Sequence, residues 1–484
     1  MSGKVDLVIK NGLVCAENAM YYGGLAIKDG IIVMQGPDSI LPDAEEVYDA
    51  EGNIIFPGAI EPHYHPGQDY PATSMELFRR DMHYETRSGA QGGYTTMCAT
   101  TLLNGTPMIE RIDQAESSLD AGWYTDSTFY TPPYTPEHFS EIEDVVKRGY
   151  TNFKFLLGYR GDMAERLGIP RSGFDTGLMY LGFEAVKKAG GVVMVHCEDP
   201  ALTEITTRWV KENYEVVHGN YLKAFSMAQP GFAEVVDICK TGYIAHELEV
   251  PLYVVHTAAK ETVDQIQFFH SKGYDITCET CVPYLLLSVD DDRCYDNEYF
   301  NKMAKVGPPV HRQADQDRLW LGINEGTVST IGTDHVAFRK EMKLDREFWD
   351  CTIGSGGLDP TSFALMISEG VNKNRASLDT IRKIMSENVA KAFNIYPRKV
   401  TLNVGSDADV VIIDLDKEYT VDHRDNESTH CGNEFDGFNL KGMPIATFLR
   451  GHLIAKDYKI VAEEAYGQPV KANTHFRSTR FYKK

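Results

Sequence analysis

The stretch Ile54-Ile-Phe-Pro-Gly-Ala-Ile-Glu-Pro-His-Tyr-His65 joins an apolar run of strand type to two histidines one residue apart. Side chains at positions i and i+2 of an extended chain point to the same side, so His63 and His65 can offer two nitrogens to one cation from a rigid support. Two histidines at this spacing often only face solvent. The pair therefore indicates a metal site only if the rest of the chain supplies further ligands.

Three later apolar runs end in the same way, on a histidine or an aspartate. Gly191-Val-Val-Met-Val-His196 and Val250-Pro-Leu-Tyr-Val-Val-His256 end on a histidine, and Gly326-Thr-Val-Ser-Thr-Ile-Gly-Thr-Asp334 ends on an aspartate. Their lengths are typical of fully buried parallel strands. A single histidine after an apolar run is more often a core residue than a ligand, but four strand ends of the same kind favour a shared site.

A lysine inside another strand-like run needs an explanation. The run Tyr150-Thr-Asn-Phe-Lys-Phe-Leu-Leu-Gly-Tyr159 is mostly apolar around Lys154, and a buried ammonium is costly unless it is paired or neutralised. Taken singly, Lys154 is expected to pair with a carboxylate. Beside the histidines and Asp334 a second interpretation arises, because a deprotonated amine can add carbon dioxide and the resulting carbamate could bridge two metal ions.

Taken in order, these motifs resemble those of the cyclic amidohydrolases of the amidohydrolase superfamily, and most closely the dihydropyrimidinase and hydantoinase family. The segment that ends at His65 is similar to the family's first-strand motif, with Glu61 where Asp is usual, and Lys154 with Tyr159 is similar to its carboxylated lysine and active-site tyrosine. Further segments in the family's order extend the resemblance over nearly the whole chain: Glu279-Thr-Cys281, Gly307-Pro-Pro309, Gly332-Thr-Asp-His335, Asn388-Val-Ala-Lys391 and Gly405-Ser-Asp-Ala-Asp-Val-Val-Ile-Ile-Asp414.

The order of strand and helix patterns predicts an α/β fold with two parts. Between residues 58 and 399 the two patterns alternate about eight times, which is typical of a parallel (β/α)8 TIM barrel, with a first strand expected near Ile54. Residues 1–57 and 400–462 have the pattern of short strands without covering helices. We expect both chain ends to form one small β-sandwich, as the resemblance also implies, and residues 463–484 to be a tail that wraps a neighbouring subunit or is loosely ordered.

The active site of such barrels lies at the carboxyl ends of the strands, which is where the candidate ligands fall. The resemblance implies one metal ion on His63, His65 and Asp334, a second on His196 and His256, and a bridging N6-carboxylysine at Lys154. Two such ions would share one water and present it as hydroxide at neutral pH. We expect zinc, although these ligands also suit manganese or cobalt.

Catalytic roles follow from the same arrangement, and the resemblance implies the substrate contacts. Asp334 is expected to be a metal ligand and also the general base that carries a proton from the attacking hydroxide to the leaving nitrogen. Tyr159 is expected to hydrogen-bond the oxyanion, with an aromatic residue at the site's rim as the alternative. The expected substrate contacts are Tyr159, Gly307 and Cys281, and Gly307 stands where hydantoinases commonly carry Ser.

The resemblance implies metal-dependent hydrolysis of the C–N amide bond of a cyclic imide or ureide. A hydantoin or dihydropyrimidine would give an N-carbamoyl amino acid or a similar ring-opened product. An allantoinase, a dihydroorotase or another cyclic-imide hydrolase of the superfamily is the alternative. A non-enzymatic dihydropyrimidinase-related protein is disfavoured, because such proteins have lost metal ligands that this chain retains.

Composition fits a soluble enzyme that binds neither nucleic acid nor membrane. The 484 residues carry a formal net charge of -22 at pH 7, so phosphate would be repelled, and no apolar run approaches the length of a membrane span. Nine cysteines without a secretory leader suit the reducing cytoplasm. The expected partners are a small cyclic amide and further copies of the chain, since the resemblance implies a homotetramer with residues 426–440 and the tail at its interface.

Overall fold

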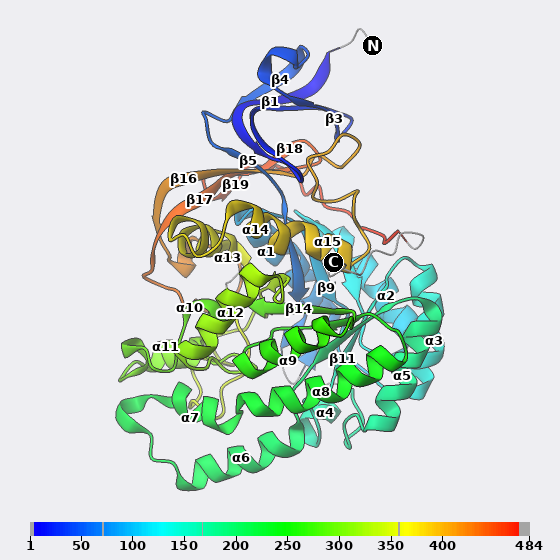
Figure 1. The fold of residues 1–484 in the computed structure, drawn as a ribbon, viewed down its shortest axis with the longest axis vertical. Helices are drawn as coiled ribbons and strands as arrows, with labels where there is room; N and C mark the ends of the chain where they lie inside the picture. Colours follow the sequence, from blue (N-terminus) through cyan, green and yellow to red (C-terminus); the bar gives the residue numbers. More distant parts are fainter. Residues whose placement is uncertain (1–3, 70–71, 167, 357–358, 474–484) are drawn as a thin grey trace.

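The structure is a computed structural model that describes residues 4–69, 72–166, 168–356 and 359–473. Figure 1 shows a body of strands surrounded by helices, with a second group of strands from both ends of the chain at one end of the molecule. Within the described ranges, each helix is too short or too polar to span a bilayer.

Buried parallel strands form the middle of the chain, where short apolar runs alternate with amphipathic helices. Each of these strands is buried along its whole length, as expected for strands covered on both faces. They make one sheet of three strands, β6 (Ala59–Tyr64), β9 (Tyr94–Thr100) and β10 (Asp126–Tyr130), and one of five, β11 (Asn152–Leu156), β12 (Val192–His196), β13 (Leu252–Val254), β14 (Ile276–Cys281) and β15 (Thr330–Gly332).

Two isolated parallel bridges connect these sheets to each other. Thr131, just after β10, pairs with Phe153 in β11, and Tyr64 in β6 pairs with His335, just after β15. Both edges of the three-stranded sheet therefore contact an edge of the five-stranded sheet. The fold of this region is α/β with parallel sheets.

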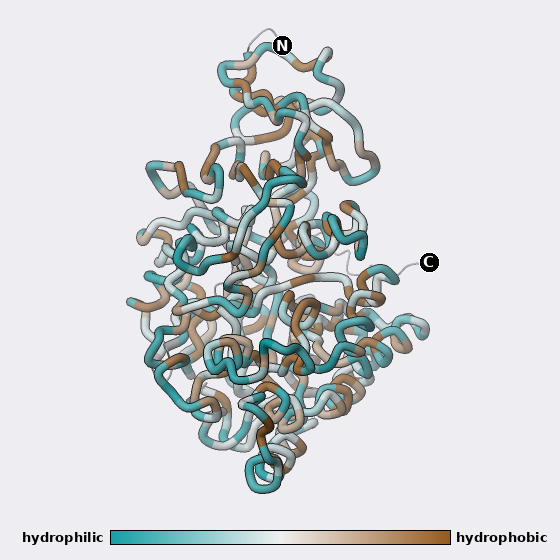
Figure 2. The backbone as a smooth tube through the Cα atoms, turned by 90° about the vertical axis from the view of Figure 1, so that its left-hand side faces the viewer, coloured by the Kyte–Doolittle hydropathy of each residue, from teal (hydrophilic) through white to brown (hydrophobic). Residues whose placement is uncertain are grey.

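Helices cover the outer faces of the parallel sheets (Figure 1), and hydrophobic and hydrophilic segments alternate along their turns (Figure 2). Several begin at a side-chain cap, such as Ser74, whose hydroxyl accepts a hydrogen bond from the Leu77 amide. The longer helices are α1 (Met75–Gln91), α2 (Met108–Ser117), α3 (Pro136–Lys147), α5 (Thr176–Ala189), α6 (Pro200–Asn213), α7 (Tyr221–Ala228), α8 (Gly231–Glu247), α9 (Lys260–Ser271) and α12 (Gln313–Glu325). Shorter ones are α4 (Asp162–Arg166), α10 (Val282–Leu286), α11 (Glu298–Met303), α13 (Asp359–Leu365), α14 (Leu378–Arg382) and α15 (Asn388–Ala392).

Both chain ends build a single mixed sheet of nine strands. It joins the amino-terminal and carboxy-terminal strands where β5 pairs antiparallel with β16. Its amino-terminal strands are β1 (Val5–Cys15), β2 (Met20–Lys28), β3 (Ile31–Gly36), β4 (Ala44–Asp49) and β5 (Ile54–Pro57), and its carboxy-terminal strands are β16 (Val410–Thr420), β17 (Asn439–Leu449), β18 (His452–Lys456) and β19 (Lys459–Ile460). A separate small hairpin pairs β7 (Gln68–Asp69) with β8 (Ala72–Thr73).

The apolar run from Ile54 is two strands of different sheets, and the expectation of a single barrel strand starting there is wrong. β5 ends at Pro57 and β6 begins at Ala59, so Gly58 is the point where the chain passes between sheets. A β-carbon at Gly58 would lie 2.0 Å from Oγ1 of Thr95. Glycine is required because the backbone passes so close to a neighbouring side chain.

The described part of the tail, residues 463–473, packs on its own chain, and the expected contact with a neighbouring subunit stays a prediction. The amides of Gly467, Val470 and Ala472 donate to backbone carbonyls at distances of 2.7, 2.8 and 2.8 Å. Their acceptors belong to Trp123, Ser127 and Gly149, which lie before or at the start of strands β10 and β11. Residues 474–484 of the tail lie outside the described ranges.

A buried ion network connects the sheet of chain ends to the parallel strands. Nζ of Lys399 lies 2.5 Å from a carboxylate oxygen of Asp126, 2.8 Å from one of Asp407 and 2.9 Å from one of Asp409. Arg450, between β17 and β18, also pairs with Asp126. These three aspartates have the spacing of a metal site, but the Lys399 ammonium binds all of them, and their charges raise its pKa despite burial. The cluster is therefore an ion network.

Candidate metal centre

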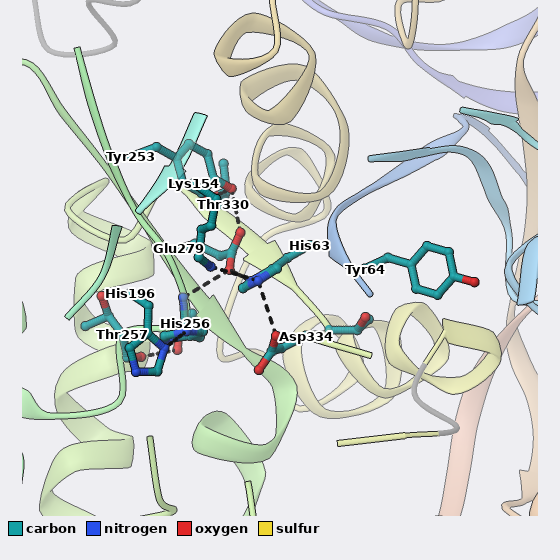
Figure 3. A network of polar contacts seen from close by, with 12 residues as sticks. His63, Tyr64, Lys154, His196, Tyr253, His256, Thr257, Glu279, Thr330 and Asp334 are labelled. Carbon is teal, nitrogen blue, oxygen red and sulfur yellow. Dashed lines mark hydrogen bonds and ion pairs between the residues drawn. The ribbon is translucent and has the colours of Figure 1, made fainter. Parts of the chain in front are cut away.

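Six side chains from five strands converge at the carboxyl ends of the parallel sheets. The strands position them differently: two ligands lie within their strand, one ends its strand, one follows its strand by one residue, and two follow theirs by two residues. Figure 3 shows how those from separate strands point toward one another. The six are His63 from β6 and His65 just after it, Lys154 from β11, His196 from β12, His256 after β13 and Asp334 after β15.

His63, His65 and Asp334 form a compact trio. The Nε2 atoms of the two histidines lie 2.9 Å apart, and Oδ1 of Asp334 lies 3.2 Å from Nε2 of His63 and 3.1 Å from Nε2 of His65. These ligand atoms are all within 4.8 Å of one another. Two imidazole nitrogens and a carboxylate oxygen at this spacing fit a divalent transition metal.

The protonation states of the trio also suit a metal. Burial lowers the pKa of His63 well below its usual value and lowers that of His65, so both imidazoles are neutral. Burial alone would raise the pKa of Asp334, but His63 and His65 hold it at about 2. Neutral imidazoles and an ionised carboxylate are the ligand forms that metals bind.

Lys154 and the other two histidines complete the group. Nζ of Lys154 lies 3.0 Å from Nε2 of His63, and Nδ1 of His196 lies 2.8 Å from Nε2 of His256. Burial lowers the pKa of Lys154 to about 8. Among the described residues, no carboxylate lies within ion-pair distance of this amine, so the ion pair considered from the sequence is absent there.

Two of the ligands have an unusual backbone conformation. His256 has a φ of 38° and Asp334 a φ of 52°, in the left-handed region that side chains other than glycine rarely adopt. Such strain persists only where surrounding contacts hold it, and it is concentrated at functional sites. One such contact is Glu61, whose Oε1 accepts hydrogen bonds from the amides of Thr333, beside Asp334, and of His63.

Two buried carboxylates lie next to the ligands, and no role for either was predicted from the sequence. Oε1 of Glu279 lies 3.0 Å from Nδ1 of His63, and Oε2 of Glu198 lies 3.2 Å from Nε2 of His196. Burial raises the pKa of Glu279 to about 7. Two signals in the sequence could have identified these carboxylates. Glu279 stands among uncharged residues of a strand, and Glu198 follows the candidate ligand His196 by two positions.

A cavity of about 450 Å³ opens over the ligands. Tyr159 and Gly307, both expected to contact substrate, line it, whereas Cys281 is buried at the end of β14 and is not among the described residues of its wall. The Tyr159 ring lies 5.1 Å from that of His196. Burial raises the pKa of Tyr159, so its hydroxyl is protonated at neutral pH and can donate a hydrogen bond. Much of the remaining wall is apolar, with Leu103, Leu156, Val336, Phe338 and Ile353.

Comparison with known proteins gives consistent results over nearly the whole chain. Residues 54–454 match the model of the amidohydrolase family. The chain is 29% identical over 474 residues to the L-hydantoinase of Paenarthrobacter aurescens, covering 96% of this chain and 97% of that protein. It is 28% identical over 469 residues to the allantoinase of Bacillus licheniformis, covering 96% and 99%.

Solved structures give the same result. The L-hydantoinase (dihydropyrimidinase) from Arthrobacter aurescens matches with a TM-score of 0.87 and 27% identity, covering 96% of this chain and 100% of that one. The dihydropyrimidinase from Brevibacillus agri matches with a TM-score of 0.84 and 26% identity, covering 97% and 99%.

Proposed function

The chain belongs to the amidohydrolase family, and on this premise we propose that it hydrolyses a C–N amide bond of a cyclic imide or ureide. The substrate would be of the hydantoin or dihydropyrimidine type and the product an N-carbamoyl amino acid or a similar ring-opened acid. The similar proteins named above are hydantoinases, a dihydropyrimidinase and an allantoinase. The observation that carries the proposal is the convergence of six candidate ligands beneath one cavity.

We propose that the parallel strands close into one (β/α)8 TIM barrel over residues 58–399, and that residues 1–57 and 400–462 form a small β-sandwich, followed by the tail. The bridges from Thr131 to Phe153 and from Tyr64 to His335 support closure, because they join the two parallel sheets at both edges. A barrel accounts for the convergence of ligands from five separate strands at one end.

We propose that His63, His65 and Asp334 hold one divalent metal ion, that His196 and His256 hold a second, and that Lys154 carries a carboxylate that bridges them. Lys154 supports this assignment, because its amine is buried among the histidines and is not paired with any carboxylate of the described residues. When bound, two ions, with zinc as the expected metal, supply an activated water and a Lewis acid for the carbonyl.

The side chains around the centre would move the proton and stabilise charge. Asp334 accepts a proton from the attacking water as the new C–O bond forms, and delivers it to the ring nitrogen as the C–N bond breaks. The protonated Tyr159 hydroxyl donates a hydrogen bond to the oxygen that becomes negative in the tetrahedral intermediate. The apolar residues of the cavity wall hold the ring and limit access of bulk water.

Metal analysis and a substrate panel test this function. The purified protein should contain two metal ions per chain, lose its ring-opening activity on chelation, and recover it when zinc, manganese or cobalt is added back. Hydantoins, dihydrouracil and allantoin should be compared as substrates. Native mass spectrometry should detect one added carbon dioxide that is absent from a Lys154→Ala variant. Activity that survives complete metal removal would contradict the proposal.

We also propose that the protein is a cytoplasmic homotetramer. All nine cysteines are free, which fits a reducing compartment. Segment 426–440 packs largely on its own chain, with Phe435 fully buried, and so offers little surface to a partner. Large exposed apolar side chains lie instead on the outer helices, including Trp209 on α6 and Phe232 on α8, which supports contacts between copies there. Light scattering that gives a monomer mass would contradict this proposal.

A further inference from the structure

We propose that Glu279 is a positioning residue of the metal centre, whose single carboxylate orients His63 from one half of the ligand set and fixes the backbone of His256 in the other. The inference rests on the proposed function, because it assigns these histidines to the two metal ions. Figure 3 shows dashed lines from the Glu279 carboxylate to His63 and to His256.

The first contact determines which nitrogen of His63 is free. Oε1 of Glu279 lies 3.0 Å from Nδ1 of His63, and both side chains are fully buried. The opposite ring nitrogen, Nε2, faces Lys154, His65 and Asp334. Because a neutral imidazole carries one proton, donation from Nδ1 to the carboxylate leaves the Nε2 lone pair directed at the other ligands.

The second contact holds a strained peptide. The same Oε1 accepts a hydrogen bond of 3.0 Å from the amide of His256, whose φ of 38° lies in the left-handed region. Without this acceptor, a buried amide would be unsatisfied at a residue that already has an unfavourable conformation. Glu279 therefore stabilises the backbone turn that directs the His256 ring toward His196, where the two ring nitrogens lie 2.8 Å apart.

The carboxylate is itself held in place from two sides. Its Oε2 accepts a hydrogen bond of 2.7 Å from the Tyr253 hydroxyl, which also lies 3.0 Å from Oγ1 of Thr330. On the other side is Gly332, where a β-carbon would lie 2.9 Å from Cδ of Glu279 and 3.1 Å from each of its oxygens. The absence of a side chain at Gly332 therefore makes room for the carboxylate.

Variants at Glu279 test this role through metal binding. Loss of a residue that supports a metal ligand typically lowers metal affinity about 10-fold to 100-fold. We expect Glu279→Ala to lose this much zinc affinity in competition with a chelator, and its cobalt-substituted form to have an altered visible absorption spectrum. Glu279→Gln should recover most of the affinity, because its amide oxygen can still accept from His63 and His256.

Glu234→Ala is the matched control. Glu234 is a buried glutamate on α8 that accepts a hydrogen bond from the Ala258 amide, but within the described ranges it makes no hydrogen bond or ion pair with any of the six candidate ligands. Its substitution should change thermal stability while metal affinity and the cobalt spectrum stay as in the wild type. An equal loss of metal affinity in Glu234→Ala and Glu279→Ala would overturn the inference, since any buried glutamate would then have the same effect.

Gly332→Ala tests the same role without removing the carboxylate. The φ of Gly332 is outside the left-handed region, so alanine there acts by displacing the Glu279 side chain. We expect a metal affinity between those of the wild type and Glu279→Ala. Wild-type affinity and cobalt spectra in both Glu279→Ala and Gly332→Ala would overturn the inference. A wild-type protein that binds no metal would instead overturn the proposed function, so the two failures are distinguishable.

Discussion

Cγ2 of Ile353 lies 2.8 Å from the position that a β-carbon on Gly307 would occupy. Both residues line the cavity over the candidate ligands. A serine at the position of Gly307 would therefore collide with Ile353. Gly307 and Ile353 together form an apolar part of the cavity wall. A serine at position 307 would instead present a hydroxyl to the substrate ring.

Exchange of this pair should change ring preference. We expect Gly307→Ser alone to destabilise the protein by about 1–3 kcal/mol through overpacking, with reduced turnover. Combination with Ile353→Ala should restore stability and shift kcat/KM toward rings with a polar edge. Thermal unfolding and a substrate panel on both single variants and the double variant measure this coupling. A fully stable and active Gly307→Ser variant would show that the space is not restricted.

Removal of the Tyr159 hydroxyl should impair turnover more than binding. If it donates to the developing oxyanion, Tyr159→Phe should lower kcat by about 100-fold to 1000-fold, the effect of losing one such donor. KM and metal content should change little, as steady-state kinetics and metal quantification can establish. Tyr180→Phe, the same change at an exposed residue of α5, is the control. Nearly full turnover in Tyr159→Phe would show that Tyr159 is only an aromatic residue at the rim of the site and does not stabilise the oxyanion.

Lys399→Met should destabilise the protein strongly. Removal of the lysine leaves Asp126, Asp407 and Asp409 buried near one another without their shared cation, and breaking a buried ion pair in this way costs about 3–5 kcal/mol. Urea denaturation should show a large fall in the midpoint. Lys417→Met, which removes an exposed partner of Asp457, should change the free energy of unfolding by less than about 0.5 kcal/mol. Equal midpoints for the two variants would contradict the role of the network.

Acid should destabilise the protein in part through His270. Burial lowers the pKa of His270 to about 4, although the hydrogen bond to the Ile276 carbonyl opposes this, whereas an unfolded histidine has a pKa of about 6.5. The neutral folded form therefore contributes stability that is present above pH 6.5 and lost as the pH falls toward 4. The loss is on the order of 2 kcal/mol at pH 5.

His270→Gln should remove this part of the pH dependence, as measured by urea unfolding at pH 7 and pH 5. The exposed His452 provides the control, because His452→Gln should leave the difference between the two pH values as in the wild type. If His270→Gln also retains the wild-type difference, titration of His270 does not contribute to acid lability.

The family and the convergence of the candidate ligands could be predicted from the sequence, because each ligand follows or lies within an apolar run. The predicted family is confirmed. Each of these ligands is visible in a short stretch of sequence: His63, His65, His196, His256 and Asp334. Parallel strands of one sheet place their carboxyl ends at the same edge, and this does not depend on how the connecting helices are arranged. The assignment of these residues to two metals, and of Tyr159 to the oxyanion, stays a prediction.

Other features depend on which residues meet across strands, and a pattern along one chain does not contain this information. Glu279 reaches His63 from a strand 216 positions later, and its place depends on the register between strands. Only glycine fits at position 58, between β5 and β6, because of the close approach of Thr95, which is remote in the sequence. The backbone hydrogen bonds of residues 467–472 could not be predicted either, because such bonds leave no mark in the residue types.

The charges around Lys399 restrict how this protein can exchange parts by recombination. Asp126 belongs to the parallel strands, whereas both cations that contact it come from beyond residue 398. A graft that supplied foreign terminal strands to this core would bury an acid without its counterions. We therefore expect chimeras to fold only when the donor brings basic residues equivalent to Lys399 and Arg450, so this acid and these two bases should be inherited together.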